Sequence, residues 1–510
     1  PSRAREEAVL TVAGLVRSLT VAVLLFNGCG SCELPPGSRK LPVRTLCRES
    51  FLGTWQRTEK GFSVQRFSVQ RSRWRVIHFV VGGPPLNTMP VSTSDVGPVT
   101  QTERIASIDV LRGFAVLGIL VMNIQAFSMI GAAYMNPTAY GDLTGVNYAV
   151  WLLSHVFADR KFMGIFSMLF GAGIVLMTSR REAAGVRTAG VHYRRMGLLL
   201  VFGLLHAYLL WYGDILFLYA MCGFVVYLFR RRRPGTLIIV GFLSIAIPTA
   251  LSVFFQWSIP YWPPEAMENT MRWWAPSHEV VAKEIAAYRG GWLGQFSHRA
   301  VTALFMQTLY LLIDGFWRAG GLMLLGMGLF KLDIFSAKRP SVTYVIMIVV
   351  GLFVGIPVIL YGVYRNFALG WVFESCMYAG GQFNYWGSIL VSLGWVGLVM
   401  LVYKHGKAQT LTRSLAATGQ MAFTCYLLQT IICTTIFYGH GFGLFGKVER
   451  VGQIGIVFAV WVLLLVVSPL WLRRFRFGPA EWLWRSLAYG KVQPMRRGIG
   501  HSNGEVVSTV

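Results

Sequence analysis

The chain has 510 residues, of which 54% are hydrophobic and 14% are charged, and its mean hydropathy is +0.53. This composition excludes a soluble domain of ordinary type. The formal net charge of +25 would suit a nucleic-acid-binding protein, but the basic residues form short clusters between long apolar blocks and no DNA-binding motif is present. We therefore predict a membrane protein without a nucleic-acid partner.

The N-terminal region, residues 1–88, differs from the rest of the chain. Its segment 62–71 repeats Phe-Ser-Val-Gln-Arg in a context rich in Arg, Ser and Gly, and residues 19–29 are apolar like a signal-peptide core. A processed secretory start would place the next segment outside, against the loop charges. We expect residues 1–88 to be a disordered or non-native upstream extension, with a DNA-binding or targeting arm as the alternative. Residues 89–104 read as a polar leader.

From residue 105 to 475, apolar blocks recur at about the 20 residues needed to cross a hydrocarbon core of about 30 Å. We predict an all-α, polytopic integral membrane helix bundle of about ten spans, within a range of about nine to eleven. An external loop is expected at 257–300 and a cytoplasmic tail at 476–510. The predicted spans are 106–128, 155–178, 194–212, 214–229, 236–256, 301–330, 341–364, 381–403, 414–438 and 453–472.

Basic clusters occupy the loops that this count places on one side of the membrane. Because cytoplasmic loops are enriched in Lys and Arg, we expect these loops and both termini to be cytoplasmic. The clusters are Arg180, Arg181, Arg187, Arg194 and Arg195; Arg230 to Arg233; Lys331, Lys338 and Arg339; Lys404, Lys407 and Arg413; and Arg473, Arg474 and Arg476.

The first span begins with charged residues. Asp109 and Arg112 are three residues apart, so a helix puts them on one face, where they either pair as an interface anchor or hold a ligand together. Arg112, beside Gly113, can present its planar guanidinium to a phosphate. Asn123 lies about 21 Å further along the helix, toward the outer leaflet, and is a candidate substrate contact.

The second span carries His155 and Asp159 near its outer end, four residues apart on one helical face. This spacing can bind a metal, but no third ligand is evident, so we predict a pair for proton transfer and no metal site. Further along the same span, Gly171-Ala-Gly173 indicates close packing against another helix.

Two apolar segments meet at Gly213-Asp214, which is a tight-turn signal. His206 precedes the turn by about 10 Å of helix, so we expect it inside the membrane with Asp214 at the mouth. A histidine in an apolar segment is often only a hydrogen-bonded core residue, but the neighbouring Trp211 and Asp214 favour a polar pocket. Asp214 either orients a base or caps the helix that begins at Ile215.

The block 301–330 is too long for one straight span, so we expect a tilted or broken helix. Asp314 inside it is a candidate substrate contact and needs a partner, for which Arg318 at i+4 is the natural choice. The loop 257–300 is rich in Trp and Pro, with an amphipathic stretch at 278–289. Its tryptophans indicate the headgroup belt or, alternatively, a lid over an external pocket.

Together these blocks resemble the YeiB-like family of bacterial polytopic membrane proteins, a family with a domain of unknown function. The resemblance covers residues from about 104 to 495. The matching motifs are Asp109-Val-Leu-Arg-Gly113, Asn136-Pro-Thr-Ala-Tyr-Gly-Asp142, Asp159-Arg-Lys-Phe162, Leu169-Phe-Gly-Ala-Gly173, Leu205-His-Ala-Tyr-Leu-Leu-Trp-Tyr-Gly-Asp214 and the tail segment that begins Phe477-Gly-Pro-Ala-Glu481.

The family is similar to the transmembrane acyltransferase superfamily, which includes heparan-alpha-glucosaminide N-acetyltransferase and bacterial sugar O-acetyltransferases. This likeness implies transfer of an acyl group from cytoplasmic acyl-CoA, most simply acetyl-CoA, to an envelope acceptor across the plasma membrane. The donor would lie against Asp109, Arg112 and Gly113. Catalysis would involve His206 assisted by Asp214, with His155 and Asp159 at the outer mouth and Trp211 near the substrate.

One departure from that superfamily matters. The heparan enzyme has its catalytic histidine in the loop after the span that begins with D-x-x-R-G, and the corresponding loop here, 128–146, contains no histidine. Its role must pass to His206 or His155, or the chemistry differs. The alternatives are a transporter or flippase of a small polar or envelope metabolite and a non-catalytic scaffold, and a homo-oligomer stays open.

Overall fold

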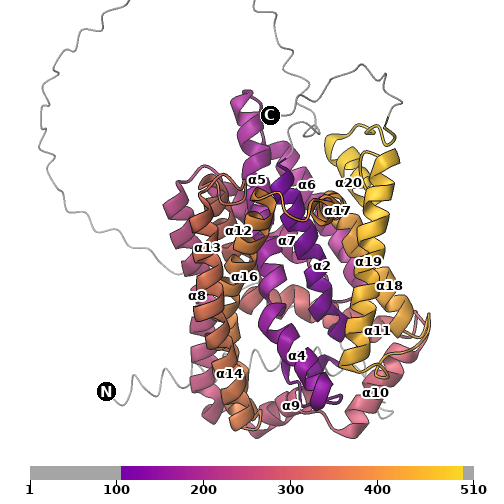
Figure 1. The fold of residues 1–510 in the computed structure, drawn as a ribbon. Coiled ribbons are helices and arrows are strands. Elements are labelled where there is room, and N and C mark those ends of the chain that lie inside the picture. Colours follow the sequence, from indigo (N-terminus) through magenta and orange to yellow (C-terminus); the bar gives the residue numbers. More distant parts are fainter. Residues whose placement is uncertain (1–104, 498–510) are drawn as a thin grey trace, which may run out of the picture. The chain divides into compact units, whose positions relative to one another are not determined.

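The computed structural model describes residues 105–497, and the part of the chain it describes contains helices and no strand (Figure 1). The expectations for residues 1–88 and 89–104 lie outside the described residues. The elements are α2 Ala106–Ser128, α3 Gly131–Met135, α4 Gly145–Phe157, α5 Lys161–Ala183, α6 Ala189–Leu205, η1 His206–Leu210, α7 Leu216–Val226, η2 Tyr227–Phe229, α8 Pro234–Ser258, η3 Ile259–Tyr261, α9 Pro264–Trp274, α10 His278–Arg289, α11 Phe296–Phe305, η4 Met306–Gly315, α12 Phe316–Lys331, α13 Ser341–Val350, η5 Gly351–Gly355, α14 Ile356–Ala368, α15 Phe373–Ser375, η6 Cys376–Gly380, α16 Gly381–Lys404, α17 Gln409–Gln420, α18 Ala422–Phe437, α19 Arg450–Arg474 and α20 Pro479–Tyr489.

Each predicted span falls on a helix, because a backbone in hydrocarbon must satisfy its hydrogen bonds internally. Among the described residues, eight helical segments are long and apolar enough to cross a membrane, and the bent pair α17–α18 can count as a ninth. The predicted span at 214–229 corresponds to a shorter apolar helix, Leu216–Phe229. The polytopic all-α bundle is confirmed, and the amphipathic stretch at 278–289 is the helix α10.

Three spans are interrupted. We predicted one span at 414–438, and as a single helix this prediction is wrong. The segment contains two helices, α17 and α18, with a bend of 85° between them. The expected break in 301–330 is confirmed as the π-helical stretch η4 between α11 and α12. The second span is divided as well, since α4 ends at Phe157 and Arg160 adopts a left-handed backbone with φ of 63° before α5 begins.

The bend between α17 and α18 is stabilised from the C-terminal tail. The carboxylate of Glu481 on α20 accepts hydrogen bonds from the Phe423 amide at 2.7 Å and the Thr424 amide at 3.1 Å. These are first-turn amides of α18, which have no partner within their own helix. Glu481 therefore does for α18 what an N-cap side chain does for an ordinary helix.

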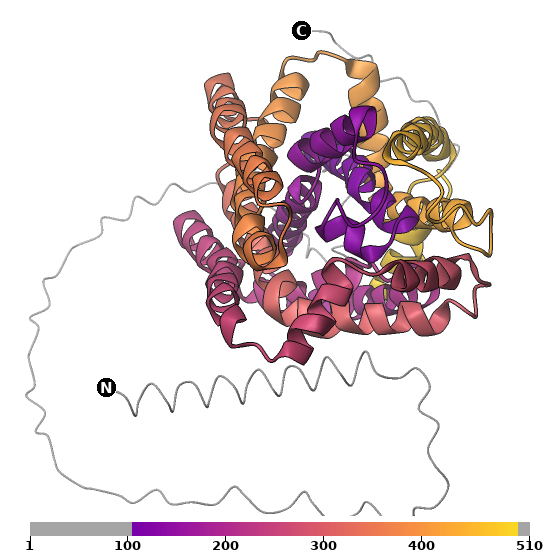
Figure 2. The ribbon, with the colours of Figure 1, turned by 90° about the horizontal axis from the view of Figure 1, so that it is seen from below.

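The bundle has inner and outer helices. In the most apolar stretch of α2, 67% is buried inside the protein, whereas the corresponding share is only 22% in α8 and in α19. Viewed along the bundle, α2 and α5 lie between the later helices (Figure 2). The outer helices leave large apolar side chains bare, as expected where the neighbour is lipid rather than water; examples 63–74% exposed are Leu243, Val253, Phe353 and Val462. The chain is a multi-pass membrane protein.

The basic loops meet at one end of the bundle, which we call the basic end. This agrees with the prediction that they share one side of the membrane. Side chains from these loops and from α20 contact one another there: Arg230 Nε lies 3.0 Å from Glu182 Oε1, Lys331 Nζ donates to the Arg230 carbonyl at 2.7 Å, Lys404 Nζ donates to the Arg339 carbonyl at 2.5 Å, and Trp484 Nε1 donates to the Arg195 carbonyl at 3.2 Å.

Close packing of α5 against α12 depends on glycine. A Cβ added at Gly171 would lie 2.0 Å from the Met323 carbonyl oxygen, and one added at Gly326 would lie 2.0 Å from the Met168 carbonyl oxygen. Gly173, two residues later, has no neighbouring atom within 4 Å of its built Cβ. Of the two glycines predicted to pack closely, only Gly171 does so.

Gly171→Ala should therefore destabilise the bundle by about 1–3 kcal/mol or more, because the helices must separate. The matched substitution Gly173→Ala should leave stability unchanged or raise it by up to about 1 kcal/mol, through helix propensity. Thermal unfolding of both variants in detergent measures this difference. Equal melting temperatures for the two variants would show that this helix contact is not tight.

Candidate functional site

The chain turns back inside the bundle after α6. The helix continues into the π-helical stretch η1, leaves helical geometry at Trp211 and re-enters it at Leu216. Because Gly203 has no side chain, the backbone at Phe217 can pack against α6; a Cβ at Gly203 would lie 2.4 Å from the Phe217 nitrogen. The first turn of α7 therefore packs against the last turn of α6.

This arrangement brings together His206, Asp214 and Thr430, which we call the His206 group. His206 Nδ1 lies 3.0 Å from Asp214 Oδ1, and the two side chains are 1% and 2% exposed. The two atoms are not aligned as a hydrogen bond, so the contact is an electrostatic pairing. On its other side, His206 Nε2 lies 3.0 Å from Thr430 Oγ1 on α18.

Asp214 has both of the roles considered for it. Its Oδ2 accepts the Phe217 amide at 2.7 Å and so caps α7, while its Oδ1 faces His206. The Asp214 side chain is enclosed by the protein, although the backbone of the turn at 213–215 is partly exposed. Trp211 is also buried: its ring stacks on Phe127 with centroids 4.0 Å apart and lies 6.4 Å from the imidazole.

The second polar cluster consists of His155, Asp159, Lys161 and Asn384, which we call the Asp159 group. His155 Nδ1 lies 3.4 Å from Asp159 Oδ2, so the predicted pairing is present even though the helix breaks between them. Asn384 donates to Asp159 at 2.7 Å and accepts from Lys161 at 2.6 Å. Lys161 is fully buried, and its second acceptor is the His155 carbonyl.

The salt-bridge partner of Asp314 is Arg160, and the predicted partner Arg318 is only an electrostatic neighbour of it. Asp314 Oδ2 lies 4.0 Å from Arg160 Nη1, whereas Arg318 donates to the Tyr385 carbonyl at 3.1 Å and to Ser388 Oγ at 2.8 Å. The π-helical stretch η4 ends at Gly315 and places more residues in each turn, so positions 314 and 318 are not stacked as they would be in a regular α-helix.

The helix that runs from α11 to α12 carries four polar side chains, which we call the polar stripe: Gln307, Tyr310, Asp314 and Arg318. Gln307 accepts the Tyr208 hydroxyl of η1 at 3.1 Å, and Tyr310 interacts with the Asp314 carboxylate.

The predicted acyl-donor residues lie toward the basic end. Arg112 Nη1 lies 2.9 Å from Asp109 Oδ1, and the Arg112 side chain keeps 28% exposure. Arg195 is an electrostatic neighbour of Arg112. Gly113 is explained by packing: a Cβ there would lie 1.9 Å from the Leu415 carbonyl oxygen, so this glycine permits the crossing of α2 and α17.

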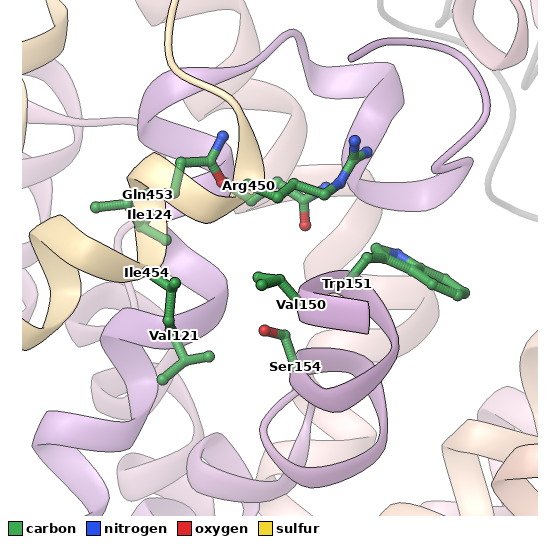
Figure 3. Close-up of a pocket in the computed structure, with 9 residues that line it drawn as sticks. Val121, Ile124, Val150, Trp151, Ser154, Arg450, Gln453 and Ile454 are labelled. Atoms are coloured by element: carbon green, nitrogen blue, oxygen red, sulfur yellow. The ribbon is translucent and has the colours of Figure 1, made fainter. Parts of the chain in front are cut away.

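Asn123 is only partly buried on α2 and contacts neither polar group. A pocket near it, between α2, α4 and α19, has room for about one water molecule, at about 20 Å³ (Figure 3). Three of the polar side chains of this pocket already bond to nearby carbonyls: Gln125 to Ala133, Gln453 to Val448, and Arg450 to Pro137, Tyr140 and Asp142. Within residues 105–497, no set of three His, Cys, Asp or Glu side chains is placed to hold a metal ion.

The helix α10 covers the end of the bundle opposite the basic end. Tyr288 on its inner face stacks on Phe445 at 4.4 Å and lies 5.0 Å from Tyr438. Glu284, one turn earlier, accepts the Gly131 amide at 2.9 Å and so ties α10 to α3. Burial raises the pKa of the Glu284 carboxyl, against the opposing effect of that hydrogen bond.

Sequence reasoning missed three residues at the heart of these groups: Thr430, Lys161 and Asn384. Thr430 is 224 positions from His206, and Asn384 is 225 positions from Asp159, so no local spacing links them. Lys161 did carry a signal, since a lysine at the start of an apolar helix requires partners within the bundle.

The fold and the two groups define a polytopic helical membrane protein with ion pairs inside its bundle. By sequence the chain is 32% identical over 428 residues to the uncharacterized protein YxaH of Bacillus subtilis (strain 168), covering 79% of this chain and 99% of that protein. It is 30% identical over 396 residues to the uncharacterized protein YeiB of Escherichia coli (strain K12), covering 77% of this chain and 98% of YeiB. The family model described as "Protein of unknown function (DUF418)" matches residues 329–491. The chain belongs to the family of YxaH and YeiB, which confirms the YeiB-like assignment.

The raised pKa of Glu284 predicts a pH-dependent stability. The folded state holds this proton more tightly than the unfolded state, so ionisation of Glu284 destabilises the fold as pH rises through the raised value. Glu284→Gln keeps an acceptor for Gly131 and should raise the melting temperature at neutral and alkaline pH, with the gain shrinking as pH falls toward 4.5, the ordinary pKa of the carboxyl.

Glu279→Gln on the same helix is the control. Glu279 is solvent-exposed and pairs with Lys283 at 2.9 Å, and this partner lowers its pKa. Its substitution should leave stability unchanged or slightly reduce it at neutral pH. A Glu284→Gln variant that melts below wild type at alkaline pH would contradict the assignment.

Proposed function

We propose that this protein is a membrane acyltransferase of the bacterial plasma membrane, which transfers an acyl group from cytoplasmic acyl-CoA to an envelope acceptor. The supporting observation is the His206 group: an imidazole held between a carboxylate and a hydroxyl, at 3.0 Å from each, inside a membrane bundle. The same three roles occur in Ser-His-Asp catalysis on unrelated folds.

The chemistry requires a base for the acceptor hydroxyl. His206 Nε2 takes the proton as the acceptor oxygen bonds to the thioester carbonyl carbon, the carbon–sulfur bond breaks, and coenzyme A leaves as a thiol after receiving that proton. Asp214 beside Nδ1 stabilises the imidazolium that forms in between. The Thr430 hydroxyl lies where the acceptor hydroxyl must approach Nε2 of His206. Thr430 therefore either relays the proton from the acceptor to His206 or moves aside so that the acceptor contacts His206 directly.

The Asp109–Arg112 pair supports the donor end of this proposal. The positive-inside rule assigns the basic end to the cytoplasm, where acyl-CoA is available. Arg112 has a partly exposed guanidinium at this end and suits a phosphate or pyrophosphate. The Asp109 carbonyl packs against Gly419, which lies just before the bend between α17 and α18. From Ala422, the first residue of α18, Thr430 is eight residues further, or about 12 Å along the helix. A pantetheine arm can span this separation.

Binding and turnover test the proposal. Calorimetry with acetyl-CoA on the purified protein should show binding that is weakened about tenfold or more in Arg112→Ala, because a charge-assisted contact is lost. Slow release of free thiol from acetyl-CoA, with water as acceptor, should fall about 100-fold or more in His206→Ala and in Asp214→Asn. Asn at 214 still caps α7, so this variant should keep its melting temperature.

Two matched controls separate function from folding. Arg187→Ala removes a charge from an exposed loop at the same end and should leave acetyl-CoA binding intact. Thr430→Ser retains the hydroxyl and should keep turnover, whereas Thr430→Val should lose it. Wild-type protein that binds no acyl-CoA would refute the acyltransferase function.

A second candidate function is transport, and the Asp159 group and its neighbours favour it. Three buried or half-buried cations, Arg160, Lys161 and Arg318, face two carboxylates, Asp159 and Asp314. Charged residues inside a bundle often line a proton or substrate path. The excess of positive charge suits an anionic substrate.

Proteoliposomes without any acyl donor test the transport function. Proton-coupled uptake of an anion, followed with an entrapped pH dye, should be present in wild type and abolished in Asp159→Asn, which retains the bond to Asn384 but loses the charge. Uptake that persists in this variant, or its absence from wild type, would exclude this path.

A further inference from the structure

Arg299 stands out among the buried charges of this chain. It lies on α11 near the end opposite the basic end, and its side chain is 0% exposed. Its Nε donates to the Tyr208 carbonyl of η1 at 3.0 Å. Its two terminal nitrogens, Nη1 and Nη2, are buried and have no hydrogen-bond partner among the described residues.

The other two fully buried arginines provide an internal comparison. The terminal nitrogens of Arg318 donate hydrogen bonds to the Tyr385 carbonyl and to Ser388 Oγ. The terminal nitrogens of Arg450 donate to carbonyls of the 137–142 loop. Both are 2% exposed. The fold therefore satisfies the terminal nitrogens of these two arginines with neutral acceptors and leaves those of Arg299 without one.

The electrostatic neighbours of Arg299 include Tyr288, Tyr438 and His440, and none of the three is an anionic partner. The Tyr438 hydroxyl is buried and likewise has no hydrogen-bond partner. Burial raises the pKa of both tyrosines well above the usual value, so both hydroxyls keep their protons at neutral pH. Within residues 105–497, no carboxylate forms an ion pair with Arg299, and Glu284 is engaged with the Gly131 amide.

We propose that Arg299 and Tyr438 form a binding site for an oxyanion, a phosphate or carboxylate group, at the end of the bundle opposite the basic end. The paired terminal nitrogens of an arginine match two oxygens of such a group, and the Tyr438 hydroxyl supplies a third donor. An unpaired buried charge is strongly unfavourable, and a bound anion would relieve this penalty.

The surroundings describe the ligand further. Gln295 Oε1, one helical turn before Arg299, is a buried acceptor without a donor, which a hydroxyl group on the ligand would provide. The cover over the guanidinium is thin: the ring of Trp292 lies 5.4 Å from Arg299 Cζ and is itself 38% exposed. A displacement of the 290–295 loop would open the site to the outside.

This site stands independently of the proposed acyl transfer, because its occupancy requires no acyl donor. Through the Tyr208 carbonyl, however, Arg299 is attached to η1, the segment that begins with His206. If both proposals hold, the acceptor of the acyl group is an anionic, hydroxyl-bearing molecule of the envelope.

Ligand-induced thermal stabilisation tests the site directly. The purified full chain, in nanodiscs of phosphatidylcholine, is melted with increasing inorganic phosphate or acetate, and with chloride at matched ionic strength. Phosphate, acetate or both should raise the melting temperature above the chloride control. The apparent Kd should weaken about tenfold or more in Arg299→Gln and several-fold in Tyr438→Phe, through loss of charged and neutral hydrogen bonds.

The matched control is Arg272→Gln. Arg272 lies on the exposed helix α9 and pairs only with Glu268, so this variant loses the same charge outside the site and should respond like wild type. Nanodiscs containing phosphatidylglycerol identify the source: if a lipid headgroup fills the site, wild type should melt higher there than Arg299→Gln, and added phosphate should add nothing.

Two results would overturn the proposal. The first is a wild-type protein that no oxyanion, free or lipid-borne, stabilises beyond chloride. The second is an unchanged phosphate response in Tyr438→Phe together with an unchanged or unmeasurable one in Arg299→Gln. Because Tyr438→Phe removes a single unpaired hydroxyl, it should fold even if Arg299→Gln does not.

Discussion

A charged side chain in hydrocarbon must find its partner inside the protein, and this constraint organises the bundle. The chain meets it by interrupting its helices. The break at Ala158–Arg160 directs Asp159 toward Asn384, the turn at 211–215 brings Asp214 back to His206, and the π-helical stretch η4 carries Asp314 toward Arg160. Each interruption loses regular helical hydrogen bonds, and each places a carboxylate where a continuous helix would not.

The two polar groups lie at different distances from the basic loops. Arg180 is 19 residues after Lys161 on α5, which is about 29 Å of helix, whereas His206 is 11 residues after Arg195 along α6, which is about 17 Å. The Asp159 group is therefore the farther of the two from the basic loops. The helix from α11 to α12 contacts both regions, through the bond of Tyr208 to Gln307 and the pairing of Arg160 with Asp314.

The sequence predicts the elements of this structure better than their contacts. Block length locates most of the spanning helices, and loop charge locates the basic end, because both follow from the bilayer itself. Local spacing also brings His155 to Asp159 and suggests His206 with Asp214. It could not identify Thr430 or Asn384, which come from distant helices, and it misassigned Arg318 because a π-helical stretch alters the register. Gly171 and Gly173 look equivalent in sequence, yet only one of them faces another backbone.

The carboxylate of Glu481 has a consequence for how the protein is made. The amides it caps open α18, and α18 carries Thr430 of the His206 group. During synthesis α20 leaves the ribosome after every spanning helix has been made, so the bend between α17 and α18 enters the membrane with bare amides. The first turn of α18 therefore acquires the Glu481 carboxylate as its acceptor only after α20 has been synthesised.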